Sequence, residues 1–404
     1  MRMNLNSKEY YIVDFIASRK YFHQYPLIIG LSQFLSKRSH SPVILLPYIA
    51  DKLELESSDG AVNYILDSGY SSRNSRPMRH LILKLLTILC GSQSSGQLIK
   101  RRMRKIYIAP GLAYFQNIKS STSKHIVFPT LDPLSLELAL RLSTRPNMKE
   151  YYFYFRIVGS ESRGILSSGD ELKLLLNLVN LHPNKIRIGV ETIGYKTYLE
   201  NLGFDPSFIF WSPWPCLDNF DKTKSKNNPI KIGFLGCAKQ RKGFDNIPKI
   251  ISQLKMEGVD FDILIQEANF PWAGYVKTKN DIEAIMGCEF KFLPSNLELI
   301  ELQENVNKCD VLILPYDTNS YSINASGVLY HACDSSVPIV TAKGVGFTAE
   351  IEKFNLGLAY VNLDEIPEIV KKIRFAKFGF LNYNSERIKA NNQFLFSRLK
   401  YIQS

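Results

Sequence analysis

The sequence predicts an α/β protein of two domains, each built on a parallel sheet, and three observations lead to this fold class. The chain has 404 residues, which exceeds one ordinary domain and suits two. From Ile230 onward, short apolar runs alternate with stretches of helical period. Between the halves, Pro213, Pro215 and Pro229 and the polar run 221–228 interrupt every regular pattern. The chain therefore divides into two halves joined by a linker.

The second half carries the clearer alternation. Apolar runs typical of buried parallel strands cover 230–235, 261–266, 289–293, 311–315, 338–342 and 358–361. Helical patterns among them cover 246–257, 296–307, 326–334 and 364–375. This succession of strand–helix units predicts a doubly wound, Rossmann-like parallel sheet.

The first half repeats the theme less regularly. Expected strands cover 10–15, 43–47, 105–109, 125–128, 150–156, 186–190 and 208–211. Expected helices cover 25–36, 132–142, 169–181 and 196–202. Asp132 followed by Pro133 is a good helix start, since the carboxylate caps free N–H groups and proline fits the first turn. This half is predicted to be α/β as well.

The predicted organisation has four parts. Residues 1–211 form a Rossmann-like domain that binds the acceptor, and 212–229 form a hinge. Residues 230–380 form the Rossmann-like domain that binds the donor. Residues 381–404 form a C-terminal helix that follows the last strand–helix unit and can cross back onto the first domain. The two domains are expected to face each other across a cleft.

Charge and cysteine content narrow the partners and the compartment. The formal net charge of +12 favours anionic partners such as nucleotide phosphates, lipid diphosphates or an anionic membrane face. The six cysteines contain no CxxC pair, so neither a zinc site nor a disulfide framework is expected. The first fifteen residues are polar where a signal peptide is apolar, and no run reaches the roughly 20 apolar residues of a membrane span. We expect a cytoplasmic protein without a metal site.

The densest basic run, 100–105, follows the apolar stretch 81–89. A basic amphipathic segment of this kind can lie on an anionic membrane, which would place the protein peripherally on the inner face of the cell membrane. The alternative is a core helix followed by a solvated loop. Nucleic-acid binding is disfavoured, because the run leads to a single aromatic residue, Tyr107, instead of aromatics interleaved with cations.

The first candidate site follows the predicted strand 230–235. Gly236 permits close backbone approach, and Lys239, Arg241 and Lys242 place three cations within four residues. Arginine binds phosphate in a bidentate manner and lysine acts as a point charge, so this loop suits a diphosphate. The alternative is an ordinary solvated basic loop, since neither a Walker loop nor the GxGxxG spacing is present.

The second candidate site follows the predicted strand 311–315. Here Ser326, Gly327 and Val328 open a helix, so their N–H groups point at whatever occupies the crevice at the carboxyl ends of the strands. A phosphate fits such a helix start. The alternative is a plain serine N-cap.

These motifs make the second half similar to the retaining GT-B glycosyltransferases, in particular to family 4. That family's first loop begins with G-R and ends with K-G a few residues later, and its Arg and Lys bind the donor diphosphate. Here Gly236 and Lys242 match, whereas Cys237 stands at the Arg position. The resemblance therefore assigns the diphosphate to Lys242, with Arg241 or Lys239 in place of the missing arginine.

The family's second signature contains two glutamates. With Pro338 as the anchor of the alignment, Asn324 and His331 stand in their places, so both glutamates are replaced. In the family the second glutamate binds the nucleotide ribose, and an imidazole also hydrogen-bonds hydroxyl groups. The alternative for His331 is a packed core residue. The loop 343–350, ending at Glu350, resembles the segment that closes the same pattern.

The first half contributes weaker candidates, which lie just past predicted strand ends. Arg156 and Glu191 are the catalytic candidates there, and a surface or capping role is the alternative for each. Further polar residues in the same positions are Glu161, Arg163, Thr192 and His23.

The resemblance implies transfer of a sugar from a nucleotide-sugar donor to a glycan or a lipid-linked saccharide in surface polysaccharide synthesis. It also implies retention of configuration and no cofactor or metal, with Arg241 and Lys242 stabilising the leaving diphosphate. A nucleotide-sugar epimerase of the same architecture is a rival, although it needs cleft carboxylates and the second half offers few. A catalytically silent scaffold is another, because both signature glutamates are missing.

Overall fold

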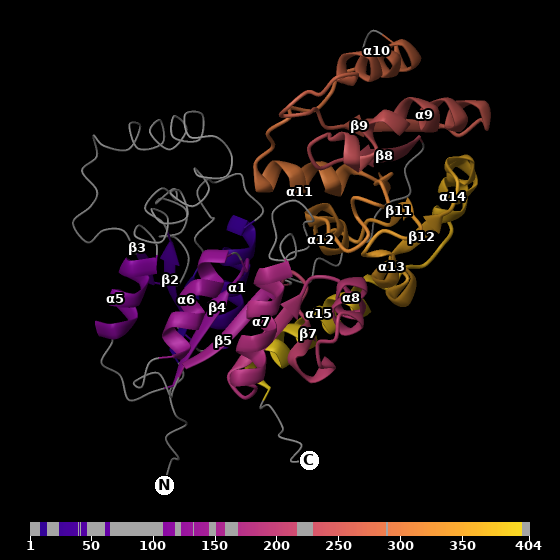
Figure 1. Cartoon of the computed structure of the whole chain (residues 1–404). Helices are drawn as coiled ribbons and strands as arrows, with labels where there is room; N and C mark the ends of the chain where they lie inside the picture. Colours follow the sequence, from indigo (N-terminus) through magenta and orange to yellow (C-terminus); the bar gives the residue numbers. More distant parts are fainter. Residues whose placement is uncertain are drawn as a thin grey trace, which may run out of the picture. The chain divides into compact units, whose positions relative to one another are not determined.

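The computed structural model describes residues 9–13, 24–38, 40, 42–46, 61–64, 108–117, 123–131, 133–144, 151–157, 169–215, 229–287 and 290–397. These residues form two sheets, one of seven strands and one of five, with helices alternating between the strands (Figure 1). All the register pairs defined between neighbouring strands are parallel. The predicted α/β class with two Rossmann-like sheets is confirmed.

The seven-stranded sheet belongs to the first half and has the order β3-β2-β1-β4-β5-β6-β7. Its strands are β1 (Glu9–Val13), β2 (Val43–Leu46), β3 (Ala61–Tyr64), β4 (Lys124–Phe128), β5 (Tyr151–Ile157), β6 (Ile186–Val190) and β7 (Ile209–Trp211). The helices are α1 (Gln24–Ser36), α5 (Ala109–Asn117), α6 (Pro133–Ser143), α7 (Gly169–Leu181) and α8 (Ile193–Asn201). Every residue of β4 and β6 is buried, as expected for parallel strands covered on both faces.

Two features of this half differ from the sequence prediction. Ala109 begins α5, so the expected strand 105–109 is wrong at its described end, and residues 105–107 lie outside the described part. The strand β3 was not predicted. The basic run 100–105, and with it the expected membrane contact, also lies outside the described residues. No helix in the described ranges has the length and apolar character needed to cross a bilayer.

The five-stranded sheet has the order β12-β11-β10-β8-β9. Its strands are β8 (Ile230–Phe234), β9 (Phe261–Ile265), β10 (Val311–Leu314), β11 (Ile339–Ala342) and β12 (Gly357–Tyr360). After β8 the chain places β9 on one side and β10 on the other, so the strand order reverses between β8 and β10. Ligands of open α/β sheets bind beyond the carboxyl ends of the strands at such a switch point.

The helices of this half are α9 (Ile247–Met256), α10 (Tyr275–Met286), α11 (Leu299–Lys308), α12 (Gly327–Asp334), α13 (Thr348–Phe354), α14 (Ile366–Ile373) and α15 (Phe380–Phe396). Neither α10 nor α13 was predicted. The expected strand 289–293 is wrong for its described residues: Leu293 alone forms an isolated bridge with Gln266. Phe290 and Phe292 are only half-buried there, so this segment does not share the continuous burial of the other strands.

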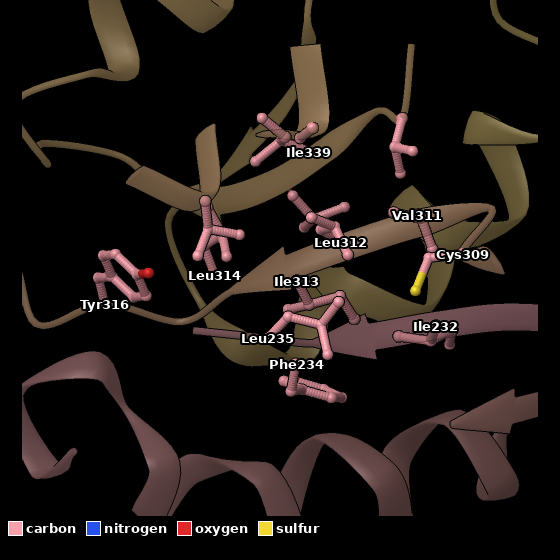
Figure 2. Close-up of a cluster of buried hydrophobic side chains, with 14 of the residues drawn as sticks. Ile232, Phe234, Leu235, Cys309, Val311, Leu312, Ile313, Leu314, Tyr316 and Ile339 are labelled. Carbon is pink, nitrogen blue, oxygen red and sulfur yellow. The ribbon is translucent and has the colours of Figure 1, made fainter. Parts of the chain in front are cut away.

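The core of the five-stranded domain forms around its central strands. All four residues of β10 are buried, and their side chains meet those of Ile232 and Phe234 from β8 and Ile339 from β11 (Figure 2). Figure 2 shows Cys309 just before β10 and Tyr316 just past its carboxyl end. The same buried core therefore holds in place the residue that begins the turn after β10.

The described residues cluster into two compact units. Those up to Ile157 and from Gly169 to Ile188 form one unit, and those from Gly189 to Ser397 form the other. The segment 189–211, expected in the first domain, thus groups with the second half. This segment continues into residues 212–214, which are hydrogen-bonded to α15. Arg387 on α15 donates to the Trp214 carbonyl from both Nε (3.0 Å) and Nη2 (2.9 Å).

Candidate functional site

The turn after β8 has the left-handed backbone that a close approach requires. Gly236 has φ +95° and Cys237 has φ +31°. A Cβ atom added to Gly236 would lie 2.4 Å from Cγ2 of Val328, in the first turn of α12. Only glycine combines this φ with this spacing. The two turns that the sequence singled out therefore lie side by side at the switch point of the sheet.

The N–H groups of this turn are already engaged. Gly236 N and Cys237 N both donate to Gln266 Oε1 at 2.7 Å, and Gln266 Nε2 donates to the Ser295 carbonyl at 3.0 Å. One side-chain carbonyl from the end of β9 thus satisfies two successive backbone donors. An anion bound here would be held by the cations of the turn and by α12, because the Gly236 and Cys237 N–H groups are engaged elsewhere.

The cations follow in a short 3₁₀ turn, Gln240–Lys242, which begins after Lys239. The Lys242 ammonium donates to the Gly236 carbonyl and lies 5.6 Å from the centre of the Tyr316 ring. Gly243 ends the turn with φ +72°, and a Cβ there would lie 1.7 Å from the Pro315 carbonyl oxygen. The turn is consequently docked against the end of β10.

Arg241 extends from the same turn and is exposed. Its guanidinium lies 5.7 Å from the centre of the Tyr321 ring, and its carbonyl accepts a hydrogen bond from Asp317 N at 3.1 Å. Within the part of the chain that the structure describes, neither Arg241 nor Lys242 forms an ion pair with a carboxylate. Two positive charges therefore stand at the switch point with no internal counter-ion.

The start of α12 lies opposite these cations. Ser326 is the N-cap residue, but its hydroxyl does not cap the helix and shares a 3.0 Å hydrogen bond with Tyr316 Oη. Burial raises the pKa of Tyr316 to about 12, so the phenol stays protonated. The hydroxyl of Ser326 thus holds Tyr316 and does not cap the N–H groups of the first turn, which begins at Gly327.

Asn324 precedes this helix and is 4% exposed. Its Nδ2 donates to the Ser320 carbonyl at 2.6 Å, while Oδ1 is buried and finds no hydrogen-bond partner among the described residues. An unpaired buried carbonyl is costly, so a donor from outside the chain would be favourable at this point.

His331 lies one turn further along α12 and is half-buried. Gln303 Nε2 donates to the His331 carbonyl at 3.2 Å, which turns Gln303 Oε1 toward His331 Nδ1 at 2.6 Å. Because Oε1 only accepts, Nδ1 carries the proton and Nε2 is left as an acceptor. Burial lowers the pKa of His331 to about 4, so the ring is neutral at physiological pH.

Glu350 lies on α13 and is 1% exposed. Its Oε1 accepts a hydrogen bond from Ile193 N, in the first turn of α8, at 2.5 Å. Burial raises the pKa of Glu350 to about 8, and the hydrogen bond from Ile193 only partly offsets this. Its observed contacts are with α8 and not with the turn at Gly236, so a donor-binding role for Glu350 stays a prediction.

Glu191 and Arg156 occupy buried positions. Glu191 Oε1 accepts from Trp214 Nε1 at 3.0 Å, and its carbonyl accepts from Trp211 Nε1 at 3.2 Å and Tyr330 Oη at 3.1 Å. These contacts fasten the end of β6 to α12. Arg156 is fully buried in β5. Their catalytic roles remain predictions, and Glu161, Arg163 and His23 lie outside the described residues.

Three residues of this site were missed by sequence reasoning: Gln266, Gln303 and Tyr316. Gln266 and Tyr316 each follow the carboxyl end of a strand, a position that could have marked them as candidates. Gln303 lies within a helix, and nothing in the sequence ties it to His331. No cluster of three or more metal-binding side chains occurs among the described residues.

Comparison with known proteins gives the architecture a name. No model of a known protein family matches the sequence, and no curated protein matches it. Solved structures do match in three dimensions over nearly the whole chain. The E. coli trehalose-6-phosphate structure bound with UDP-2-fluoro glucose has a TM-score of 0.56 at 10% identity and covers 95% of each chain. The fold is GT-B.

Two further GT-B structures show the same likeness. HepE of Anabaena in complex with UDP-glucose has a TM-score of 0.54 at 14% identity and covers 95% of this chain and 98% of its own. A structure assigned as a UDP-N-acetylglucosamine 2-epimerase from Listeria monocytogenes has a TM-score of 0.52 at 11% identity, covering 95% and 93%. Identities this low establish the shared GT-B fold alone.

Proposed function

We propose that this GT-B protein is a glycosyltransferase whose nucleotide-sugar donor binds at the carboxyl ends of the five-stranded sheet. The observation that carries the proposal is the contact between Gly236 and Val328, which brings the basic turn and the start of α12 together at the strand-order reversal. Among the described residues, no carboxylate forms an ion pair with Arg241 or Lys242 there. A diphosphate supplies the charge that this arrangement needs.

The chemistry would be electrostatic. As the bond between the sugar and the diphosphate breaks, negative charge accumulates on the departing phosphate oxygens. The Lys242 ammonium is already oriented by the Gly236 carbonyl and the Tyr316 ring, so little reorganisation is needed to meet that charge. Arg241 is exposed and can swing onto the phosphate in a bidentate manner. These groups supply positive charge from the chain itself.

The nucleoside would extend along α12. The family resemblance places the ribose at His331, where the family has a carboxylate. With Nδ1 held by Gln303, a neutral His331 offers Nε2 as an acceptor for a ribose hydroxyl. A neutral acceptor forms a weaker hydrogen bond than a carboxylate, so we expect weaker ribose binding than in the family.

The finer assignment follows the family resemblance. It comprises retention of configuration, a glycan or lipid-linked saccharide as acceptor, a role in surface polysaccharide synthesis and peripheral membrane association. UDP-sugars are the first donors to test, because two GT-B structures of the same fold bind UDP-glucose or its 2-fluoro analogue.

An epimerase is the second candidate, favoured by the Listeria monocytogenes structure of similar fold. Incubation of the protein with UDP-N-acetylglucosamine and no acceptor separates the two reactions. An epimerase converts the nucleotide sugar, whereas a transferase hydrolyses it slowly and releases UDP.

Binding of nucleoside diphosphates tests the proposal directly. Calorimetry with UDP, GDP, CDP and dTDP should detect one preferred nucleotide. Lys242→Met should lower the affinity for that nucleotide by about tenfold to a hundredfold, because a charge-assisted hydrogen bond is lost. Lys277→Met, at an exposed position on α10, is the matched control and should bind as the wild type does. No binding of any nucleotide would favour a silent scaffold. Equal binding by Lys242→Met would remove Lys242 from the site.

A further inference from the structure

A cavity of about 710 Å³ opens beside the proposed diphosphate site, over the carboxyl ends of β10, β11 and β12. One wall comes from the basic turn and the start of α9, and the opposite wall comes from residues 360–364. Arg241 and Tyr316 belong both to the proposed donor site and to the lining of this cavity. Its volume lies within the range of small-molecule sites, about 300–1,000 Å³.

The floor of the cavity is partly aromatic and its rim is polar. Tyr316 and Tyr360 are buried at the bottom, 3% and 4% exposed. Asn246, Thr318 and Asn362 contribute amide and hydroxyl groups at the rim. The Asn246 side chain does not cap α9, although it stands at the N-cap position. With both tyrosines buried, the cavity mainly presents hydrogen-bonding groups that both donate and accept.

The charges around the cavity decide which ligand it suits. Two cations, Arg241 and Lys249, line it together with three carboxylates, so the formal balance is 2 − 3 = −1. Lys249 is paired with Asp364 at 3.0 Å. Of the other two carboxylates, Asp317 accepts from Ser320 N at 2.8 Å and Asp245 accepts from Thr278 Oγ1 at 3.2 Å. A diphosphate would meet a net negative lining, whereas a neutral ligand carries no such cost.

We propose that this cavity binds an uncharged oligosaccharide, as a site separate from the nucleotide crevice. The hydroxyl groups of a sugar both donate and accept, so they can pair with the amides, hydroxyls and carboxylates of the rim. Arg241 stands between the cavity and the diphosphate site, so a bound glycan would lie next to the place of sugar transfer. The proposal does not depend on the chain being an active transferase.

The test uses an occluding variant and a matched control. Val361 lines the cavity and is 69% exposed, so Val361→Trp fills the opening without disturbing the core. Val276 is 64% exposed on α10 and lies outside the cavity, and Val276→Trp controls for the added indole. Thr318→Val removes one rim hydroxyl and keeps the shape of the side chain. None of the three positions belongs to the proposed donor site.

The probes are malto-, cello-, manno- and chito-hexasaccharides, titrated calorimetrically into the full chain, with UDP titrated in parallel. The wild type and Val276→Trp should bind one hexasaccharide with equal affinity. Val361→Trp should bind the same hexasaccharide about tenfold or more weakly. Thr318→Val should weaken it by about threefold to tenfold, the effect of one net hydrogen bond. UDP affinity should be the same in all four proteins.

Three outcomes would overturn the proposal. The wild type could bind none of the hexasaccharides, or Val361→Trp could bind them as well as Val276→Trp does. Alternatively, UDP could displace the hexasaccharide, and Val361→Trp could weaken the binding of both ligands. That result would make the cavity a part of the nucleotide crevice. Since UDP binding is measured separately, a failure to bind the hexasaccharides can be distinguished from a failure of the proposed function.

Discussion

Gln266 accepts, through a single side-chain oxygen, the backbone N–H groups of Gly236 and its neighbour Cys237 at 2.7 Å each. This contact holds the left-handed turn after β8 in the shape that places Gly236 against α12. It also joins β9 to the proposed donor site, since Gln266 directly follows that strand. The side chain therefore shapes the site without needing to contact a ligand.

Two substitutions of Gln266 should distinguish its role in holding the turn after β8 from the effect of charge on nucleotide binding. Gln266→Leu leaves two N–H groups without their acceptor and should lower the free energy of unfolding by about 1–3 kcal/mol. Gln266→Glu keeps the acceptor for the two N–H groups but loses the donor to the Ser295 carbonyl, so it should also lower the stability. The negative charge that it adds beside the diphosphate site should weaken nucleotide binding. Urea unfolding and calorimetry with UDP measure the two effects. Equal nucleotide affinity in Gln266→Glu and wild type would place the diphosphate elsewhere.

Gly243 and Gly258 allow a steric prediction with an internal control. Both have left-handed backbones, φ +72° and φ +66°, but a Cβ on Gly243 would lie 1.7 Å from the Pro315 carbonyl, whereas Gly258 has open space within 4 Å. Gly258→Ala should cost only the backbone strain, about 1–2 kcal/mol. Gly243→Ala should cost about 2–4 kcal/mol, because the basic turn must also shift away from β10. Equal losses in urea unfolding would show that the turn is not docked as described.

His331 should make the protein less stable in mild acid. Its pKa is lowered to about 4 in the folded chain, so between that value and about 6.5 the unfolded chain binds more protons. Stability should therefore fall as pH decreases from about 6.5 to 4. His331→Gln should lose this dependence, by about 1–3 kcal/mol between the two ends of the window. Urea unfolding at pH 7.5, 5.5 and 4.5 measures this dependence, and parallel profiles for the two proteins would contradict a neutral imidazole in the folded chain.

Glu350 should have the opposite effect at higher pH. Its pKa is raised to about 8, so above the ordinary carboxyl value of 4.5 the folded chain holds a proton that the unfolded chain has lost. The stability that Glu350 contributes is thus complete below about pH 4.5 and is lost as pH rises toward 8. Glu350→Gln keeps an acceptor for Ile193 N and carries no charge, so it should be more stable than wild type at pH 8 and similar at pH 4.5. A constant difference across this range in thermal or urea unfolding would rule out the raised pKa.

The bounds of the described elements show which of them the local sequence pattern predicts. Periodicity predicted β6 and α7 with the bounds that the structure has, 186–190 and 169–181, because continuous burial and helical amphipathicity are properties of neighbouring residues. The same reasoning failed at 289–293, where alternating phenylalanines look apolar but only Leu293 reaches the sheet. It also passed over α13, whose seven residues are too few to display a helical period.

For the site, chain order alone placed Gly236, Lys242 and Ser326 at the carboxyl ends of parallel strands, and the structure shows that these strands, β8 and β10, are neighbours. Tertiary structure decided the rest. In the folded chain, two N–H groups donate to Gln266, and the Ser326 hydroxyl is hydrogen-bonded to Tyr316. Glu350 contacts α8, and residues 189–211 group with the second unit. Periodicity reports which face of an element is buried, whereas these contacts join residues from distant parts of the chain, and only packing in three dimensions selects such partners.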